Sequence, residues 1–286
     1  MNSQLPTPNS PGRPCSGVGR WELLKALRPF FTGAIALARN AVHPLSVIPL
    51  LLARHSQWRT SFRVGKLVVS ARRADLTAIS EFADHGEYDF ITRLAGPADA
   101  LILDLGANVG CFSALVLSHY ADAEVHSVEP SPDTFRVLER NRRRYPGLDW
   151  HVHRLAIAAA TGRVTFTDGG ASTARRLIPG GRGVDVEAER FSAFVSRIAG
   201  TRPVFLCKMD IEGAELPIFA AGDLAPFEQI EHLVVEVHGG VEECRMVTRV
   251  LSSAFPQLET ITRPTSSKPL LHAWRPRPAG AATTSA

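Results

Sequence analysis

The stretch LILDLGANVGCFSAL, residues 101–115, decides how this chain folds. An apolar run carries an acid, Asp104, near its end, and two glycines, Gly106 and Gly110, follow with Asn108 between them. A short continuous apolar run predicts a buried strand, and the residues after Gly110 predict a helix that begins at the glycine turn. In open parallel sheets, ligands bind beyond the carboxyl ends of the strands. This turn is therefore the first candidate for a ligand site.

Strand and helix patterns alternate from this stretch to the end of the chain. Such alternation predicts an α/β fold, with a mostly parallel sheet covered by helices on both faces. We expect one strand over residues 148–158, an extra short strand over 162–170 and a helix over 186–200. The last two strands have no helix between them, which predicts an antiparallel hairpin at the sheet edge. Before the sheet, residues 59–71 predict a pair of strands and 74–96 predict one or two helices.

Composition divides the chain into a basic arm and an acidic body. Residues 1–60 hold seven Lys or Arg and one acid, so the remainder carries a net charge of −2 although the whole chain carries +4. An acidic body argues against nucleic acid as a partner. Four scattered cysteines indicate a reducing compartment, and the absence of a signal-peptide pattern leads us to expect a cytoplasmic protein.

The basic arm is also the most apolar part of the chain. Two short helices are expected, over about 20–42 and 45–55, because Arg39, Pro44 and Pro49 interrupt any longer one. The arm is either a cap packed on the body or an element lying at a membrane surface, in which case the protein is peripheral there. The expected organisation is a disordered tail (1–19), a basic apolar helical extension (20–60), a strand and helix lead-in (61–96), the main domain (97–276) and a second disordered tail (277–286).

The acid and the glycines indicate which cofactor the turn binds. Dinucleotide sites favour G-x-G-x-x-G, whereas here the spacing is G-x-x-x-G and Asp104 precedes it, where a pyrophosphate would be repelled. S-adenosylmethionine instead carries an ammonium and a sulfonium, which a carboxylate attracts, directly or through a water or an amide that it orients. Glu129 ends the next strand and is expected to accept hydrogen bonds from the ribose hydroxyls, as the corresponding acids of dinucleotide folds do.

A second polar group is expected at the ends of two later strands. Asp210 follows one strand, and Glu236 and His238 share one face at the end of the next. His238 and Asp210 are candidate bases for an acceptor hydroxyl. A divalent metal held here is an alternative, but no known ligand spacing occurs and we expect none. Lys208, inside an apolar strand, needs an acidic partner, either Asp210 or Glu236.

These blocks together resemble the FkbM-type methyltransferases, over roughly residues 84–262. The most specific is KMDIEGAE, Lys208 to Glu215; a segment that often precedes it in the family as T-L-D-x-L has no matching acid here (residues 188–194). The resemblance implies a class I methyltransferase fold, a seven-stranded sheet with a reversed last strand, and methyl transfer to a hydroxyl of a sugar, glycolipid or secondary metabolite.

The expected site follows from the turn, the strand ends and these blocks together. Glycine-rich residues 167–183 could form a mobile lid carrying Ser172 and Thr173. An NAD-dependent oxidoreductase on a related fold and a non-catalytic binding subunit remain alternatives, and the oligomeric state is not predicted. The expected cofactor residues are Asp104, Gly106, Asn108, Gly110, Glu129 and Ala156; the expected catalytic residues are Asp210, Glu212 and His238.

Overall fold

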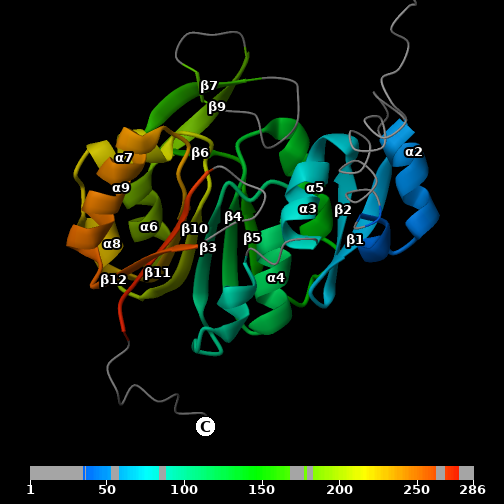
Figure 1. The fold of residues 1–286 in the computed structure, drawn as a ribbon, viewed down its shortest axis with the longest axis horizontal. Coiled ribbons are helices and arrows are strands. Elements are labelled where there is room, and N and C mark those ends of the chain that lie inside the picture. The colour runs from blue at the N-terminus through cyan, green and yellow to red at the C-terminus, as the bar shows by residue number, and fades with distance from the viewer. Residues whose placement is uncertain are drawn as a thin grey trace, which may run out of the picture.

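The computed structural model describes residues 35, 37–52, 58–83, 88–167, 177–178, 183–261 and 268–276. Its centre is a seven-stranded sheet in the order β12-β13-β11-β10-β3-β4-β5 (Figure 1). The strands are β3 (Leu101–Leu105), β4 (Glu124–Val128), β5 (Trp150–His153), β10 (Val204–Met209), β11 (Ile230–Glu236), β12 (Gln257–Ile261) and β13 (Leu270–Trp274).

The sheet has the mixed topology that the sequence predicted. Strands β11, β10, β3, β4 and β5 pair in parallel, whereas β13 runs antiparallel to both β11 and β12. The seven-stranded sheet with a reversed last strand is therefore confirmed. The chain order of its central strands changes direction around β3, which puts the turn after β3 at the topological switch point, where α/β proteins bind ligands.

Helices cover both faces because the central strands are apolar on both sides. One face of β3 (Leu101, Leu103 and Leu105) packs with α6 (Phe191–Ala199), α7 (Glu215–Ala220), α8 (Ala225–Glu228) and α9 (Val241–Ala254). Ile102 faces the other way, toward α4 (Cys111–His119) and α5 (Pro132–Arg142). A buried strand of a parallel sheet has this two-sided apolar character.

A second sheet corrects two sequence expectations. Residues 148–158 do not form one strand: β5 ends at His153, and β6 (Ala156–Ala158) pairs with β9 (Gly183–Arg190) instead of continuing along β4. Residues 186–200 are not one helix either, since β9 runs to Arg190 and α6 begins at Phe191. Val186 and Ala188 are buried at a spacing of two, a strand period that the charged neighbours concealed. The predicted extra strand is β7 (Gly162–Thr167), and the sheet order is β6-β9-β7-β8, with β8 at Leu177–Ile178.

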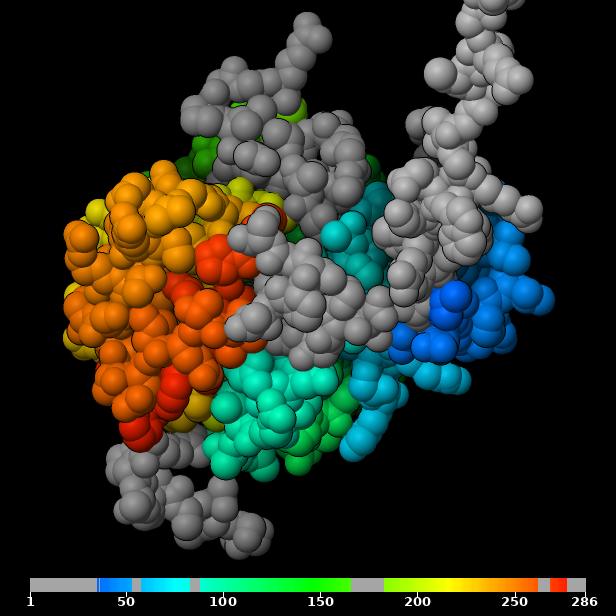
Figure 2. Space-filling model, in the orientation of Figure 1, coloured from blue at the N-terminus to red at the C-terminus, as the bar shows by residue number. Residues whose placement is uncertain are grey.

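The lead-in packs against the main sheet through α4 and α5. The predicted strand pair is confirmed as β1 (Arg59–Val64) and β2 (Leu67–Arg72), followed by 3-10 helix η2 (Arg73–Asp75), α3 (Leu76–Ala83) and η3 (Asp89–Arg93). Phe62 and Val69 share an apolar cluster with Val109 and Ala114. The space-filling view places this blue-to-cyan part at the end of the molecule opposite the orange C-terminal third (Figure 2).

The described part of the N-terminal extension is a packed cap. It contains 3-10 helix η1 (Pro44–Ser46) and α2 (Val47–Leu52), and Leu50 is fully buried beside Phe62. Leu45 and Leu52 are exposed, so the predicted membrane-surface contact of residues 20–55 stays a prediction. Of the predicted helix over about 20–42, residues 35 and 37–40 are helical. Its earlier part, residues 53–55 and both predicted tails lie outside the described residues. Within the part of the chain that the structure describes, no helix combines the length and apolarity needed to cross a membrane.

Candidate active site

A cavity opens at the carboxyl ends of β3, β4 and β10. Its floor is the turn after β3, and its walls come from α3, from β6 and from the residues that follow β4 and β10. Clefts at this place in an α/β sheet are where such folds bind small molecules and cofactors. The lining residues are Ala78, Glu81, Phe82, Gly106, Ala107, Asn108, Cys111, Phe112, Val128, Glu129, Pro130, Ala156, Ile157, Lys208, Asp210, Ile211 and Glu212.

The two glycines of the turn have different structural reasons. Gly106 lines the cavity at φ +80°, and a Cβ there would overlap the backbone carbonyl oxygen of Asp210. Gly110, at φ +93°, is absent from the lining; a Cβ there would lie 2.8 Å from side-chain carbons of both Leu138 and Trp150. Gly110 was expected among the cofactor residues, but contact with the cavity does not explain why a glycine stands there. The glycine is required for packing against α5 and β5.

Asp104 lies below the cavity and not in its wall. Its side chain is fully buried, and Oδ2 accepts a hydrogen bond of 2.6 Å from the Ser113 hydroxyl. Its Oδ1 lies 3.6 Å from Nζ of Lys208. Burial raises the pKa of this carboxyl above its ordinary value, against the attraction of the Lys208 ammonium. Asp104 therefore does not reach the cavity itself, and it can affect a bound cofactor only through Lys208 or the turn.

Lys208 joins the turn to the second group of acids. It pairs in register with Asp104 across β10 and β3, and its Nζ lies 3.2 Å from Oδ2 of Asp210 and donates to the Gly106 carbonyl at 3.2 Å. Burial by itself lowers the pKa of this ammonium, but the paired carboxylates Asp210 and Asp104 raise it above the ordinary value. The expected partner Asp210 is confirmed. Asp104 was the partner we missed, because only the strand register reveals it.

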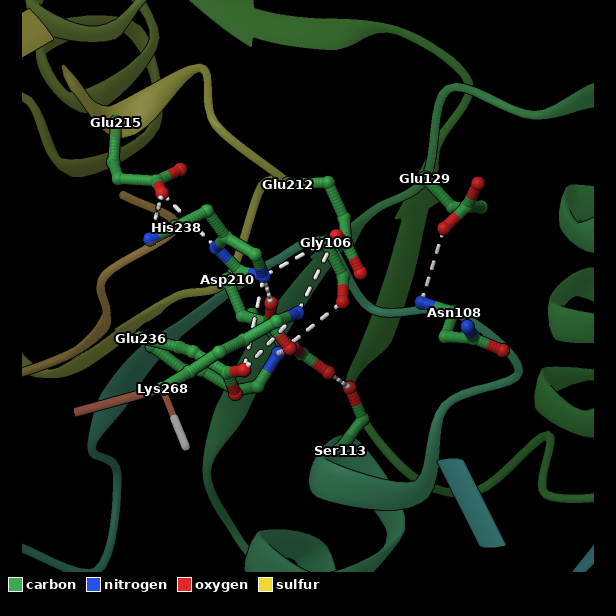
Figure 3. Close-up of polar contacts among 12 residues, drawn as sticks. Gly106, Asn108, Ser113, Glu129, Asp210, Glu212, Glu215, Glu236, His238 and Lys268 are labelled. Carbon is green, nitrogen blue, oxygen red and sulfur yellow. Dashed lines mark hydrogen bonds and ion pairs between the residues drawn. The ribbon is translucent and has the colours of Figure 1, made fainter. Parts of the chain in front are cut away.

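Glu129 is fixed at the cavity wall by backbone amides. Its Oε1 accepts from the Ser131 N–H at 2.8 Å, and its Oε2 accepts from the Asn108 N–H at 3.1 Å (Figure 3). Asn108 takes φ +52°, a conformation that asparagine tolerates well, and this turns its N–H toward the carboxylate. A carboxylate oxygen can accept more than one hydrogen bond, so a carboxylate held in this way at a cavity wall suits hydroxyl donors as well.

His238 lies beside the cavity, behind Asp210 and Glu212. Its Nδ1 and its backbone N–H both meet Oε1 of Glu215, at 2.9 and 2.7 Å. Its Nε2 lies 3.2 Å from Glu212 Oε2, 3.6 Å from Asp210 Oδ1 and 3.7 Å from Glu236 Oε1 (Figure 3). Burial opposes charge on the ring, but the neighbouring carboxylates raise the pKa of His238 to about 10. A raised pKa favours the protonated ring, which pairs with these carboxylates, and the predicted role of His238 as a base stays a prediction.

Asp210 is the ionised acid at the cavity wall. Burial raises its pKa, but Lys208, His238 and Lys268 together bring the pKa below the ordinary value. Glu215 is fully buried and also accepts from the Gly213 N–H at 2.9 Å. It therefore positions His238 and the loop, a larger role than the helix-dipole contact that its place near a helix start suggests.

Sequence reasoning missed the contribution of the lead-in to the site. Ala78, Glu81 and Phe82 of α3 form one wall of the cavity. An amphipathic helix before the sheet carried no signal that its outer side meets a ligand. Lys268 was also missed: its Nζ lies 3.4 Å from Glu236 Oε1 and 3.6 Å from Glu212 Oε2. Of the predicted site residues, Gly106, Asn108, Glu129, Ala156, Asp210 and Glu212 line the cavity. The predicted lid residues Ser172 and Thr173 lie outside the described residues.

The arrangement favours a positively charged ligand with hydroxyl groups. Glu81, Glu129, Asp210 and Glu212 surround the cavity, and Lys208 is the basic side chain in its wall. Apolar side chains, Phe82 and Ile157 among them, also line the cavity and can pack against an apolar or aromatic part of a ligand. The second acid group at the ends of β10 and β11 lies next to this cavity through Asp210 and Glu212.

Comparison with known families and proteins agrees with this geometry. A methyltransferase FkbM domain model matches residues 104–258, which is more than half of the chain. The chain is 27% identical over 163 residues to Methyltransferase 1 of Beauveria bassiana, an alignment that covers 49% of this chain and 66% of that protein. It is 28% identical over 179 residues to the hexuronic acid methyltransferase AglP of Haloferax volcanii, covering 59% of this chain and 69% of that protein.

A solved structure shares the fold. The crystal structure of a methyltransferase FkbM from Methylobacillus flagellatus superimposes with a TM-score of 0.50 at 16% identity, covering 87% of this chain and 60% of that one. At this identity the likeness speaks for the fold alone. The chain spans about two thirds of the two curated relatives described above and 60% of the solved structure.

Proposed function

Since the chain belongs to the FkbM methyltransferase family, we propose that it transfers a methyl group from S-adenosylmethionine to a hydroxyl of a sugar or related small molecule. One observation carries the proposal. The cavity at the switch point is walled by the Gly106–Asn108 turn and by a Glu129 carboxylate that two backbone amides hold in place. An acceptor of hydroxyl hydrogen bonds beside an acidic, partly apolar cavity fits a cationic nucleoside.

Different residues of the cavity are proposed to bind different parts of the cofactor. Glu129 accepts from the ribose hydroxyls, because it lines the cavity and a carboxylate oxygen can accept more than one hydrogen bond. Phe82 and Ile157 contact the base. Asp210 and Glu212 lie near the charged end, where their negative charge is favourable to an ammonium and a sulfonium. When bound, S-adenosylmethionine supplies a methyl group on a positively charged sulfur.

Orientation of the acceptor provides most of the expected rate. The acceptor oxygen must lie about 3 Å from the methyl carbon and in line with the breaking bond. The C–O bond then forms as the C–S bond breaks, and the hydroxyl proton passes to a base. Asp210 is ionised, lies at the cavity wall and is held by Lys208, so it is the residue suited to accept that proton. Because His238 is already protonated, its charge holds Asp210 and Glu212 in position.

The acceptor class follows from the relatives and remains a proposal. AglP carries the name of a hexuronic acid methyltransferase, and a uronic acid offers several hydroxyls beside a carboxylate. Lys268, 40% exposed at the rim, could meet such a carboxylate. We therefore propose uronic acids and their glycosides as the first acceptors to test, ahead of glycolipids and secondary metabolites.

Calorimetric titration with S-adenosylhomocysteine is the experiment that tests the cofactor site. The wild type is expected to bind with micromolar affinity. Glu129→Ala removes hydrogen bonds between a charged acceptor and the ribose, so binding should weaken about 10- to 100-fold. The matched control is Glu242→Gln, an acid on α9 whose side chain is 80% exposed. Its affinity should equal that of the wild type.

Transfer of a labelled methyl group to uronic acids completes the test. Product that forms with wild type but not with Asp210→Asn, when both proteins are saturated with S-adenosylmethionine, would support the proposed base. Tight binding of NADH with no binding of S-adenosylhomocysteine would favour an oxidoreductase. A non-catalytic subunit would be favoured if the protein bound the cofactor but transferred no methyl group to any acceptor, and if Asp210→Asn changed no methylation product in cells.

A further inference from the structure

Three side chains at the ends of β10 and β11 aim donor atoms at one point. Asp210 follows β10, Glu236 is the last residue of β11, and His238 comes two residues later. Their positions place all three on one face of the sheet, beside the cavity (Figure 3). One ligand atom from each lies within 4.8 Å of the other two. The group is assembled from two strands, which is why no ligand spacing is visible in the sequence.

His238 is held in the manner of a metal-ligating histidine. Its Nδ1 lies 2.9 Å from Oε1 of Glu215, a carboxylate that is itself fully buried. Nε2 is buried, in a side chain only 9% exposed, and makes no hydrogen bond to any of the residues that the structure describes. A carboxylate on one ring nitrogen, with the other nitrogen aimed at further carboxylates, is how proteins orient histidine toward a metal.

The distances around Nε2 suit ligands that share an ion. Asp210 Oδ1 lies 3.6 Å away and Glu236 Oε1 lies 3.7 Å away, both too long for hydrogen bonds. Two donors bound to one ion at about 2.1–2.3 Å are separated by about 3.0–3.7 Å. Glu212 Oε2, 3.2 Å from Nε2, can serve as a fourth donor. Lys208 holds Oδ2 of Asp210 at 3.2 Å and so leaves Oδ1 directed at the shared point.

We propose that Asp210, Glu236 and His238 form a binding site for a divalent transition metal ion of the Mn²⁺ class, with Glu212 beside it. A ligating imidazole is neutral, so the ion displaces the proton that Nε2 of His238 carries in its absence. Carboxylate oxygens favour Mg²⁺ and Mn²⁺, whereas an imidazole nitrogen favours the transition metals, so the mixed set points to Mn²⁺, Fe²⁺ or Zn²⁺ before Mg²⁺. Lys268 lies 3.4 and 3.6 Å from Glu236 and Glu212 and competes with the ion for their charge.

The site would also give the proposed methyl transfer a further component. Asp210 and Glu212 line the cavity, so an ion bound to them borders the position of the acceptor. Such an ion can bind the acceptor hydroxyl and lower its pKa. This role rests on the proposed function. Metal binding itself does not, because it is measured without cofactor or acceptor.

Electron paramagnetic resonance of Mn²⁺ tests the site directly, since the signal of the free ion disappears on binding. We expect the full chain to bind one Mn²⁺ with wild-type residues, and Glu236→Gln and His238→Ala to weaken binding at least about tenfold. Lys268→Met should strengthen binding, because a competing positive charge is removed. Glu242→Gln, the exposed acid on α9, is the matched control and should bind as wild type does.

Two results would overturn the proposal. One is wild-type protein that leaves the Mn²⁺ signal unchanged. The cluster would then be an imidazolium held by carboxylates. The other is binding that persists in Glu236→Gln and His238→Ala, which would place the ion elsewhere. Glu215→Gln and Lys268→Met supply the answer if a ligand variant fails to fold. S-adenosylhomocysteine titration of the same samples shows separately whether the proposed function survives.

Discussion

The turn after β3 and the edge formed by the ends of β10 and β11 both carry carboxylates, yet they solve opposite problems. At the turn, Asp104 is sealed from solvent between a serine hydroxyl and the Lys208 ammonium. At the edge, four carboxylates surround His238, and Lys268 approaches them from the rim. The turn is a rigid platform whose polar groups meet one another. The edge concentrates negative charge beside a cavity, where a cationic ligand gains most.

The sharpest way to break this contrast is to disturb the point where the two regions touch. Gly106→Ala places a methyl group against the Asp210 carbonyl oxygen and strains a residue at φ +80°. We expect a loss of about 3 kcal/mol or more in the free energy of unfolding, from backbone strain and overlap together. S-adenosylhomocysteine binding should also be lost. Urea unfolding and calorimetry measure the two effects.

Gly200→Ala is the matched control for that substitution. Gly200 has φ +58°, but a Cβ there meets no atom within 4 Å. It carries the strain without the overlap, so the expected cost is about 1–2 kcal/mol with unchanged ligand affinity. Equal losses in the two variants would show that the turn does not depend on its contact with Asp210.

Removing Lys208 should have the next largest effect, because this ammonium links the two regions. Lys208→Met leaves Asp104 and Asp210 without their shared cation, and breaking a buried pair costs about 3–5 kcal/mol. Adding Asp104→Asn removes the uncompensated buried charge and should recover part of the stability. Lys66→Met, at an exposed position, should change stability by less than about 0.5 kcal/mol. No recovery in the double variant would mean that Asp104 is not charged beside Lys208.

The turn was the more predictable of the two regions because its signals are local. An apolar strand, two glycines and an acid stand within ten residues, and a glycine at positive φ follows from them. What the sequence could not show is which way each side chain faces. Asp104 and Asp210 are both acids at a strand end, but Asp104 is still inside β3 whereas Asp210 follows β10 and reaches the cavity.

The edge was less predictable because its contacts join distant segments. The pairing of β10 with β11 was expected, so Asp210, Glu236 and His238 were placed together correctly. The pKa of His238 is raised in part by Glu215, which lies 23 residues away in the sequence. No spacing in the sequence reveals that Glu215 is buried beside it. The small second sheet was misjudged because β6 is only three residues long and charged residues separate the buried positions of β9.

Ser113→Ala tests whether the turn is structural. The variant removes the hydrogen bond to Asp104 Oδ2 and leaves a buried carboxylate oxygen without its donor, at a cost of about 1–3 kcal/mol. Because Asp104 does not line the cavity, affinity for S-adenosylhomocysteine should change less than about twofold, that is, by under 0.5 kcal/mol. Ser253→Ala on α9, which loses an exposed hydrogen bond to its own helix, is the control.

At the edge, removing one polar group should affect methyl transfer more than stability, the opposite of what is expected for Ser113→Ala. Glu212→Gln removes one of several like charges around His238, so the free energy of unfolding should shift by less than about 1 kcal/mol in either direction. Methyl transfer should fall more than in Ser113→Ala, since Glu212 lines the cavity. A large stability loss in Glu212→Gln would show that the edge, like the turn, is chiefly structural.

A histidine stack on β4 and β5 sets the pH background against which the two regions must be compared. His153 Nε2 lies 2.9 Å from His126 Nδ1, and burial lowers the pKa of His153 to about 4 and also lowers that of His126. Below the ordinary pKa of about 6.5 the unfolded chain binds protons that the folded chain refuses. The contribution of this stack to stability should therefore be complete above pH 6.5 and decline as the pH falls from there toward 4.

His153→Gln should flatten that decline, and urea midpoints measured across this pH range will show it. The control is His43→Gln, at an exposed position near α2, which should retain the wild-type slope. An unchanged slope in His153→Gln would assign the pH dependence to other groups. With the stack disrupted, pH dependence of methyl transfer that persists at constant stability would point to the ionisable groups that line the cavity, Asp210 among them.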